Sequence, residues 1–322
     1  MDRAWQQHDQ PSVAPMLPER HGMKPEERIH QDSMASGLDR HGRDCRFLKS
    51  ALTHHAYAGV RLEMKSTVTE DQAPLDYDQD QVAQQYQEAK QQLWRSRIEE
   101  PSLMRLIGDL RGKRVIDAAC GEGYFTRRLR QAGAAEVVGF DISERMIELA
   151  RSQEAHDPLG IAYRVEDART VVPQQSFDLV VSAWLLVHAQ TREELQEFCD
   201  GIASRLRPGG RFVTLTTNPD VYFFRPRPDY RKYGFEMTLA EHVKGGAPIR
   251  FTMHLEKADL EIVNYYLPLT EYREAFRRAG FRDFQLHPLH LAPDPAGRDD
   301  RADWEDFLKN PIMILFDCVK VE

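Results

Sequence analysis

Residues 115–129 read VIDAACGEGYFTRRL, an apolar run followed by two closely spaced glycines and then a charged segment. This pattern predicts a buried strand, a tight turn and a helix, the first unit of a parallel α/β sheet that holds a nucleotide-like ligand at its edge. A dinucleotide site has the spacing G-x-G-x-x-G, but here Gly121 and Gly123 are followed by Thr126 in the third place. The turn therefore favours a ligand that needs the first two glycines and no pyrophosphate.

Strand-like and helix-like segments alternate on both sides of this turn, and the order predicts the fold. Strands are expected at 114–119, 136–140, 161–165, 177–184 and 211–217, with helices at 123–132, 143–153 and 191–206 between them. A hairpin at 250–267, a helix at 270–281, a strand at 284–289, a short helix at 303–308 and a last strand at 312–321 follow. We predict an α/β, doubly wound, seven-stranded, mostly parallel sheet of Rossmann-like type with an antiparallel edge strand.

The chain divides into an extension and a main domain. Residues 1–75 are rich in His, Gln, Pro and Asp and lack periodicity, so we expect a disordered or lid-like extension, or a true start at Met64. Residues 76–322 form the domain, with an acceptor-binding insertion at about 218–268. It opens with a helix at 81–94, whose apolar stripe is expected to comprise Val82, Tyr86, Ala89 and Leu93.

Composition excludes several classes of protein. The net charge of −8 argues against nucleic-acid binding, and no apolar run approaches the about 20 residues that span a bilayer. No secretory leader is evident, so a cytoplasmic location is expected. The four cysteines, Cys45, Cys120, Cys199 and Cys318, are far apart and are expected to be free thiols.

Three carboxylates at the ends of neighbouring predicted strands identify the ligand. Asp117 lies inside the first strand, where a charged group needs a partner such as an ammonium. Asp141 ends the second strand, where an acid can accept both ribose hydroxyls. Asp167 follows the third strand and can meet the exocyclic amine of adenine. An ammonium, a ribose and an adenine without a pyrophosphate together describe S-adenosylmethionine.

Five segments in order, VIDAACGEGYFTRRL, VVGFDISERMIELAR, VEDAR, FDLVVSAWLLVH and LRPGGRFV, resemble the successive motifs of class I S-adenosylmethionine-dependent methyltransferases. The resemblance is strong over about residues 80–217 and looser beyond. It implies that the backbone around Ala119, Gly121 and Gly123 holds the methionine part, and that Ala183 and Trp184 lie near the sulfonium. For the nucleoside it implies Asp141 at the ribose, with Ile142, Met146, Asp167 and Ala168 around the adenine.

Two other classes share parts of this pattern. An NAD-dependent dehydrogenase would have the same fold, but it predicts a glycine at position 126 and has no need of Asp167. A non-catalytic binding module is the second alternative, because fold alone does not determine function. The intact glycine turn and Asp141 favour the enzyme.

The methyl acceptor is approached through three features. His188, after the fourth strand, is either a general base or a histidine that only orients its loop. Six aromatic residues could line an apolar acceptor pocket capped by Tyr86, where their rings would attract a carbocation. The alternative is that most of them are ordinary core residues. They are Trp184, Tyr222, Phe223, Phe224, Tyr265 and Tyr266. Basic residues beside them could clamp a diphosphate or carboxylate, or form an exposed loop: Arg225, Arg227, Arg231 and Lys232.

Together these features lead us to expect a small, lipophilic acceptor from secondary metabolism. The long N-terminal part and the aromatic–basic middle are similar to terpenoid C-methyltransferases, which implies C-methylation and cyclisation of a prenyl diphosphate such as farnesyl diphosphate. The alternative is N- or O-methylation of a small heterocyclic or phenolic metabolite. DDRAD at 299–303 matches a magnesium-binding pattern, D-D-x-x-D. It lies just before a predicted short helix, and such a charge run is usually a solvated face, so we expect no metal. Assembly as a homo-oligomer remains open.

Overall fold

The computed structural model describes residues 75–173 and 176–321. The predictions made for residues 1–74, namely the extension, the start at Met64 and the thiol of Cys45, lie outside this range. In the part that is described, Cys120, Cys199 and Cys318 are buried free thiols. No helix in it is long and apolar enough to cross a membrane.

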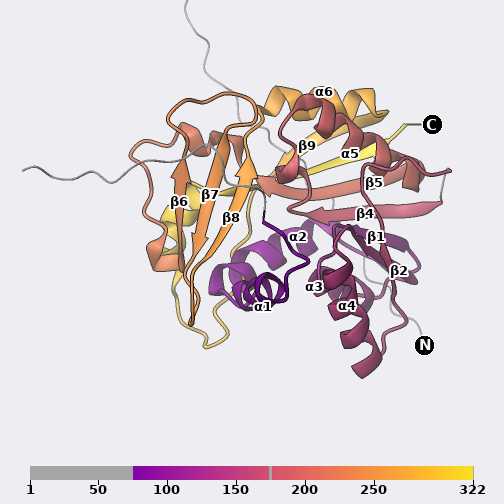
Figure 1. Ribbon diagram of the computed structural model, residues 1–322, viewed down its shortest axis with the longest axis horizontal. Helices are drawn as coiled ribbons and strands as arrows, with labels where there is room; N and C mark the ends of the chain where they lie inside the picture. Colours follow the sequence, from indigo (N-terminus) through magenta and orange to yellow (C-terminus); the bar gives the residue numbers. More distant parts are fainter. Residues whose placement is uncertain (1–74, 174–175, 322) are drawn as a thin grey trace, which may run out of the picture. The chain divides into compact units, whose positions relative to one another are not determined.

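A seven-stranded sheet forms the centre of the fold (Figure 1). Its strands are β1 (Arg114–Ala118), β2 (Glu136–Asp141), β3 (Ala162–Val165), β4 (Phe177–Ala183), β5 (Leu206–Thr217), β9 (Phe281–His287) and β10 (Met313–Lys320). They lie in the order β3-β2-β1-β4-β5-β10-β9. The first five are parallel, and β10 runs antiparallel to both β5 and β9. This confirms the predicted fold class, with the antiparallel strand one place in from the edge.

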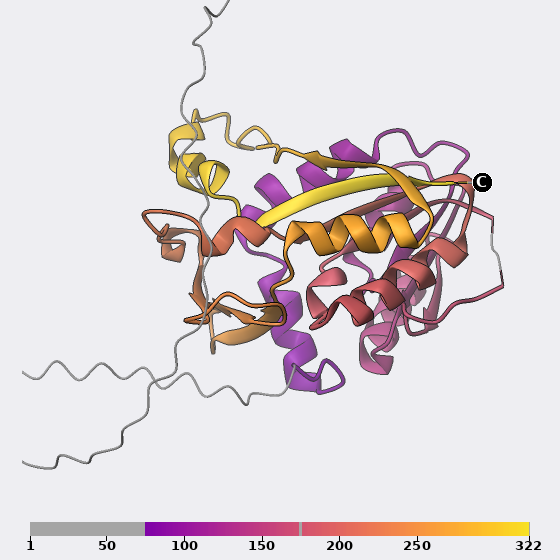
Figure 2. The same cartoon turned by 90° about the horizontal axis from the view of Figure 1, so that it is seen from above.

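Helices cover both faces of this sheet because successive residues of each strand point to opposite sides. Val115 and Val181 belong to one buried cluster, which includes residues of α2 (Glu100–Ile107), α3 (Tyr124–Gln131) and α4 (Glu144–His156). Ile116 and Val180 belong to the other, with α5 (Arg192–Arg205) and α6 (Leu269–Arg278). Figure 2 shows α5 and α6 side by side. Thr191 caps α5 as predicted, since its hydroxyl accepts from the Glu194 N–H over 3.1 Å.

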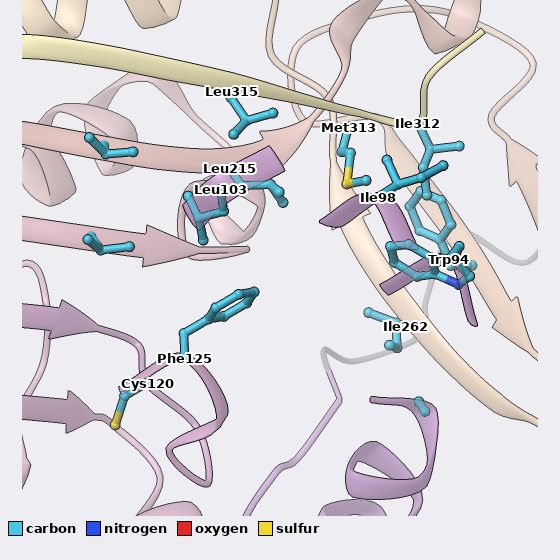
Figure 3. Close-up of a cluster of buried hydrophobic side chains, with 14 of the residues drawn as sticks. Trp94, Ile98, Leu103, Cys120, Phe125, Leu215, Ile262, Ile312, Met313 and Leu315 are labelled. Atoms are coloured by element: carbon cyan, nitrogen blue, oxygen red, sulfur yellow. The ribbon is translucent and has the colours of Figure 1, made fainter. Parts of the chain in front are cut away.

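A second sheet of three strands was only partly predicted. β7 (Pro248–Met253) and β8 (Leu260–Tyr265) form the expected antiparallel hairpin. β6 (Phe235–Leu239) adds a third strand in a segment that the prolines upstream suggested to be irregular. The first cluster continues into this sheet, and Figure 3 shows Trp94, Ile98 and Ile312 gathered there, with Ile262 of β8 nearby.

The helical start of the domain differs from the prediction. α1 (Asp80–Ala89) ends at Ala89, and the chain turns at Lys90 before a one-turn π-helix, η1 (Arg95–Glu99). Leu93, expected on the buried stripe, is 56% exposed, because the break in the helix rotates it away. Charged side chains of η1 face the interior instead, and Glu99 is 1% exposed.

The short helices after residue 300 are 3-10 turn η5 (Arg301–Trp304) and α7 (Glu305–Lys309). Asp300, from the DDRAD stretch, is not a solvated acid. It accepts two hydrogen bonds from Arg97, at 2.6 and 2.9 Å, and one from the Trp304 indole. The pair ties this segment to η1. Among the described residues no cluster of His, Cys, Asp and Glu could hold a metal ion.

Candidate active site

A cavity of about 390 Å³ opens at the carboxyl ends of β1, β2 and β4. In an open parallel sheet this is the edge at which ligands bind. It is closed on one side by residues that precede η1 and on another by β7 and β8. Of the predicted site residues, those that line it are Tyr86, Ala119, Gly121, Asp141, Ile142, Met146, Asp167, Ala168, Ala183, Trp184 and His188.

The glycine turn brings bare backbone to the cavity wall. Gly121 has a φ of 55°, a left-handed conformation that favours glycine, and its N–H donates to Asp141 Oδ2 over 2.8 Å. Gly123 has a φ of 91° and does not line the cavity. A Cβ there would lie 2.5 Å from the Tyr163 hydroxyl, so this glycine serves the packing of the turn.

The contacts of Thr126 explain why a threonine occupies the position of the third glycine. It is fully buried, and its hydroxyl donates to Asp117 Oδ2 over 2.6 Å. Burial raises the pKa of Asp117 to about 7, although this hydrogen bond opposes the shift. Asp117 lines a second, smaller cavity next to the first. The threonine thus holds in place a buried acid at the ligand-binding edge.

The other two acids differ in their surroundings. Asp141 accepts from the N–H groups of Gly121 and Ser143, yet burial raises its pKa above the ordinary value. Asp167 is bound by Arg169, whose Nη2 donates to its Oδ2 over 2.6 Å. This guanidinium holds the pKa of Asp167 below its usual range. Asp167 therefore enters the cavity already paired, which the strand pattern did not predict.

Trp184 combines a strained backbone conformation with a hydrogen bond from its side chain. It follows β4 with a φ of 69°, a conformation that costs a bulky residue on the order of 1–3 kcal/mol. Its indole N–H donates to Glu99 Oε1 over 2.5 Å. Glu99 in turn pairs with Arg95 over 2.8 Å. Burial raises the pKa of Glu99, but Arg95, Lys90 and Trp184 outweigh that effect and keep it below its usual value.

His188 is a neutral side chain in the cavity wall. It ends the 3-10 turn η2 (Leu186–His188) and meets the edge of Tyr77, which also packs against Tyr86 at 5.4 Å between ring centres. Burial lowers the pKa of His188 to about 4. Its ring therefore carries a free lone pair at neutral pH.

The side of the cavity opposite the glycine turn is apolar, with one amide. From β7 and β8 it is lined by Phe251, Met253, Ile262, Val263 and Asn264. Trp94, Leu185, Val187 and Ile312 continue this wall. Asn264 is 4% exposed, and its Nδ2 donates to Thr217 Oγ1 over 2.8 Å.

The predicted substrate-binding residues lie elsewhere. None of Tyr222, Phe223, Phe224, Arg225, Arg227, Arg231, Lys232 and Tyr265 lines the cavity. Arg231 pairs with Asp229 and Lys232 with Asp306, while Arg225 donates to the carbonyls of Tyr222 and Phe224. Tyr222 is a core residue, 2% exposed, and Phe223 points outward at 59% exposure. Arg231 and Lys232 are thus paired with acids, and the predicted clamp lies away from the cavity, which corrects its expected place.

Three contributors were missed by reasoning from sequence: Lys90, Arg95 and Glu99. Charged residues in a helical stretch look solvated, and only the break after Ala89 turns them inward. One signal was present: Arg95 and Glu99 are four residues apart with opposite charges, and Trp94 stands beside them.

Comparisons with known proteins agree with the geometry. A family model described as a methyltransferase domain matches residues 115–210. N-demethylindolmycin N-methyltransferase of Streptomyces griseus is 30% identical over 189 residues, which cover 56% of this chain and 74% of that protein. Ubiquinone biosynthesis O-methyltransferase of Bordetella avium is 30% identical over 126 residues, or 38% of this chain. That match spans about half of the relative's length, 51%.

Solved structures show the same fold. A S-adenosylmethionine dependent methyltransferase from Mesorhizobium loti superposes with a TM-score of 0.50 at 25% identity, over 69% of this chain and 97% of that one. A S-adenosylmethionine-dependent methyltransferase from Clostridium acetobutylicum gives a TM-score of 0.52 at 12% identity, over 74% and 99% of the two chains. At that identity the second likeness concerns the fold alone.

Proposed function

The chain belongs to the class I S-adenosylmethionine-dependent methyltransferases, and we propose that it methylates a nitrogen or oxygen atom of a small, largely apolar ring compound. The observation that carries this proposal is the apolar cavity wall from β7, β8 and Trp94, with the neutral ring of His188 beside it. Bound S-adenosylmethionine supplies a methyl group on a sulfonium, which is electrophilic enough to need positioning more than acid catalysis.

The residues on the other side of the cavity fit this cofactor. A side chain at Gly121 would project toward Tyr86, 3.9 Å from its ring, so the bare backbone leaves the space between them free. We assign the ribose to Asp141 and the adenine to Ile142, Met146, Asp167 and Ala168. The methionine part is assigned to Asp117, Ala119, Gly121 and Ala183. Gly123 is left out, because it shapes the turn without reaching the cavity.

The acceptor is proposed to lie between Trp184 and the β7–β8 wall. Aromatic and aliphatic side chains there favour a flat apolar molecule, and Asn264 and His188 can orient a polar group on it. Relatives named as an N-methyltransferase and an O-methyltransferase support the same acceptor atoms.

His188 is proposed to take the proton that the acceptor gives up. Its pKa of about 4 leaves the ring unprotonated at neutral pH, so it can accept a hydrogen bond from an N–H or O–H group. A base this weak suffices where the methylated atom becomes a strong acid as it turns cationic, as a phenolic oxygen or an N–H nitrogen of an aromatic ring does. Tyr77 and Tyr86 exclude water from this part of the cavity.

A prenyl diphosphate is a poorer candidate than the sequence suggested. A diphosphate needs several free cations, but the arginines that line the cavity, Arg95 and Arg169, are each paired with an acid. The other basic residues expected to bind it lie outside. We therefore favour the alternative reading, N- or O-methylation.

The test is incubation of the full chain with methyl-labelled S-adenosylmethionine and a panel of indoles, other azaheterocycles, phenols, catechols and farnesyl diphosphate. We expect label on nitrogen or oxygen of a ring compound, and a large loss of turnover in the His188→Leu variant with little change in cofactor affinity. Label on a prenyl carbon alone would overturn the proposed acceptor class.

A further inference from the structure

A second cavity, of about 20 Å³, adjoins the large one and shares Tyr86, Ala119, Gly121 and Ala183 with its wall. Its other lining residues include Lys90, Asp117 and Glu122. Because it has room for little more than a water-sized group, it suits the polar end of a ligand whose body occupies the large cavity.

Lys90 is a buried cation without an acid beside it. It is 9% exposed, and its ammonium lies over the rings of Tyr86, Tyr124 and Phe125, at 5.0, 5.6 and 5.5 Å from their centres. No carboxylate of residues 75–173 or 176–321 forms an ion pair with it. Burial lowers its pKa to about 8, and the more distant Glu99, Glu122 and Asp117 oppose that shift. A buried charge in this position needs a counterion.

We propose that Lys90 binds the carboxylate at the amino-acid end of S-adenosylmethionine, while Asp117 binds the ammonium of the same group. This inference rests on the proposed placement of the cofactor along the glycine turn. One cation and one anion then line a single small cavity and match the two charges of a zwitterion. The third charge there, Glu122, is already engaged, because Gln153 Nε2 donates to its Oε2 over 2.6 Å.

The position of Lys90 in the chain gives this contact a second effect. Lys90 is the C-cap residue of α1, directly after Ala89, and Tyr86, one turn earlier, lines both cavities. A carboxylate held by Lys90 therefore fixes the end of α1 and with it the tyrosine above the glycine turn.

The experiment compares two ligands that differ only in the carboxylate. Calorimetry on the full chain measures binding of S-adenosylmethionine and of decarboxylated S-adenosylmethionine, for the wild type and for Lys90→Met. We expect the wild type to bind the complete cofactor roughly tenfold to hundredfold more tightly. In Lys90→Met that preference disappears, because its affinity for the complete cofactor falls to the level of the analogue.

Two controls test the assignment of the carboxylate to Lys90: the Asp117→Asn variant and the ligand preference of the wild type. Asp117→Asn should weaken both ligands alike, since both carry the ammonium. The role of Lys90 would be overturned if Lys90→Met lost affinity for the two ligands equally. It would also be overturned if the wild type bound both ligands with the same affinity, a result that does not depend on the folding of the variant. If neither ligand binds the wild type, the proposed function fails as well.

Discussion

Thr126 shows how one hydroxyl adapts a common turn. A third glycine would let a helix approach a strand closely, but here the position supplies a donor to a carboxylate that is 2% exposed. An ionised acid at that depth is costly unless its oxygens accept hydrogen bonds. The discrepancy visible in the opening stretch is thus an interaction within the site.

Replacing Thr126 by valine, of nearly the same shape, removes that donor. We expect the free energy of unfolding to fall by about 1–3 kcal/mol, since a buried acid loses its partner. Urea denaturation measures the change, and Thr126→Ser, which keeps the hydroxyl, should lose less. Equal losses in the two variants would mean that the methyl group matters and the hydrogen bond does not.

Asp117 makes stability depend on pH in a defined direction. Its pKa rises from 3.8 in the unfolded chain to about 7 in the folded one, so between these values the folded state binds the extra proton. Stability therefore falls as pH rises through this window and levels off above pH 7. Relative to the wild type, Asp117→Asn should gain up to about 4 kcal/mol between pH 4 and 7, measured by denaturation at each pH without ligand. A constant difference would contradict the shifted pKa.

The feature of the site that the sequence predicted best is the placement of the three acids near the strand ends. Asp117, Asp141 and Asp167 follow apolar runs, so parallel packing alone brings them to one edge. The pairing of Asp167 with Arg169, two residues on, and the depth of Lys90 depend on side-chain packing, for which no periodicity exists. The basic cluster at 225–232 was misleading because Arg231 is paired with Asp229 within the cluster, and Lys232 with Asp306, which is distant in sequence.

At the scale of elements, η1 is the connection between the chain's helical start and the active site. Two of its buried charges, Arg95 and Glu99, form an ion pair on one turn, and Arg95 Nε also donates to the Ala89 carbonyl over 2.9 Å. Through Glu99 this turn holds the indole of Trp184. π-type turns often occur at functional sites, and here the turn directs charge inward.

Removing one member of this pair should be far more costly than removing a surface pair. We expect Glu99→Ala to lose about 3–5 kcal/mol of unfolding free energy, because Arg95 is left buried and unpaired. Glu305, which pairs with Lys309 at the same spacing on the exposed α7, is the matched control. Glu305→Ala should change stability by less than about 0.5 kcal/mol.

Urea denaturation measures both variants. The double variant Arg95→Met/Glu99→Ala should be more stable than Glu99→Ala alone, since no uncompensated charge remains. If Glu99→Ala and Glu305→Ala lost similar amounts of unfolding free energy, the buried pair would stabilise the fold no more than the exposed one.

The elements themselves were predicted unevenly. The alternation of strands and helices from β1 to β5 was clear, because buried parallel strands and amphipathic helices have different periods. The single long helix expected at 81–94 breaks at Lys90, where tertiary packing overrides a helix-favouring stretch. β6 was not predicted, because an eight-residue loop separates it from its neighbour β7 and the sequence therefore holds no tight-turn signal between them.

At the scale of the whole molecule, cofactor binding and folding are linked. A ligand that binds only the folded state stabilises it by about 2.7 kcal/mol at a hundredfold excess over its dissociation constant. For a domain of this size that corresponds to a rise of roughly 5–10 °C in melting temperature.

A thermal melt with S-adenosylmethionine should show this rise, and NAD at the same concentration should not. Asp141→Ala should abolish most of it, because the variant lacks the acid assigned to the ribose. A comparable rise with NAD, or an undiminished rise in Asp141→Ala, would contradict the assigned nucleoside contacts.

The cavity's two walls come from two different sheets, joined near the site by the hydrogen bond from Asn264 to Thr217. Laboratory redesign can exploit that division. Methylation of other acceptors can be sought by varying β7 and β8, while the strands of the large sheet, to which the nucleoside contacts are assigned, keep their register. Libraries that preserve Asn264 and Thr217 should retain more folded members than libraries that scramble this link.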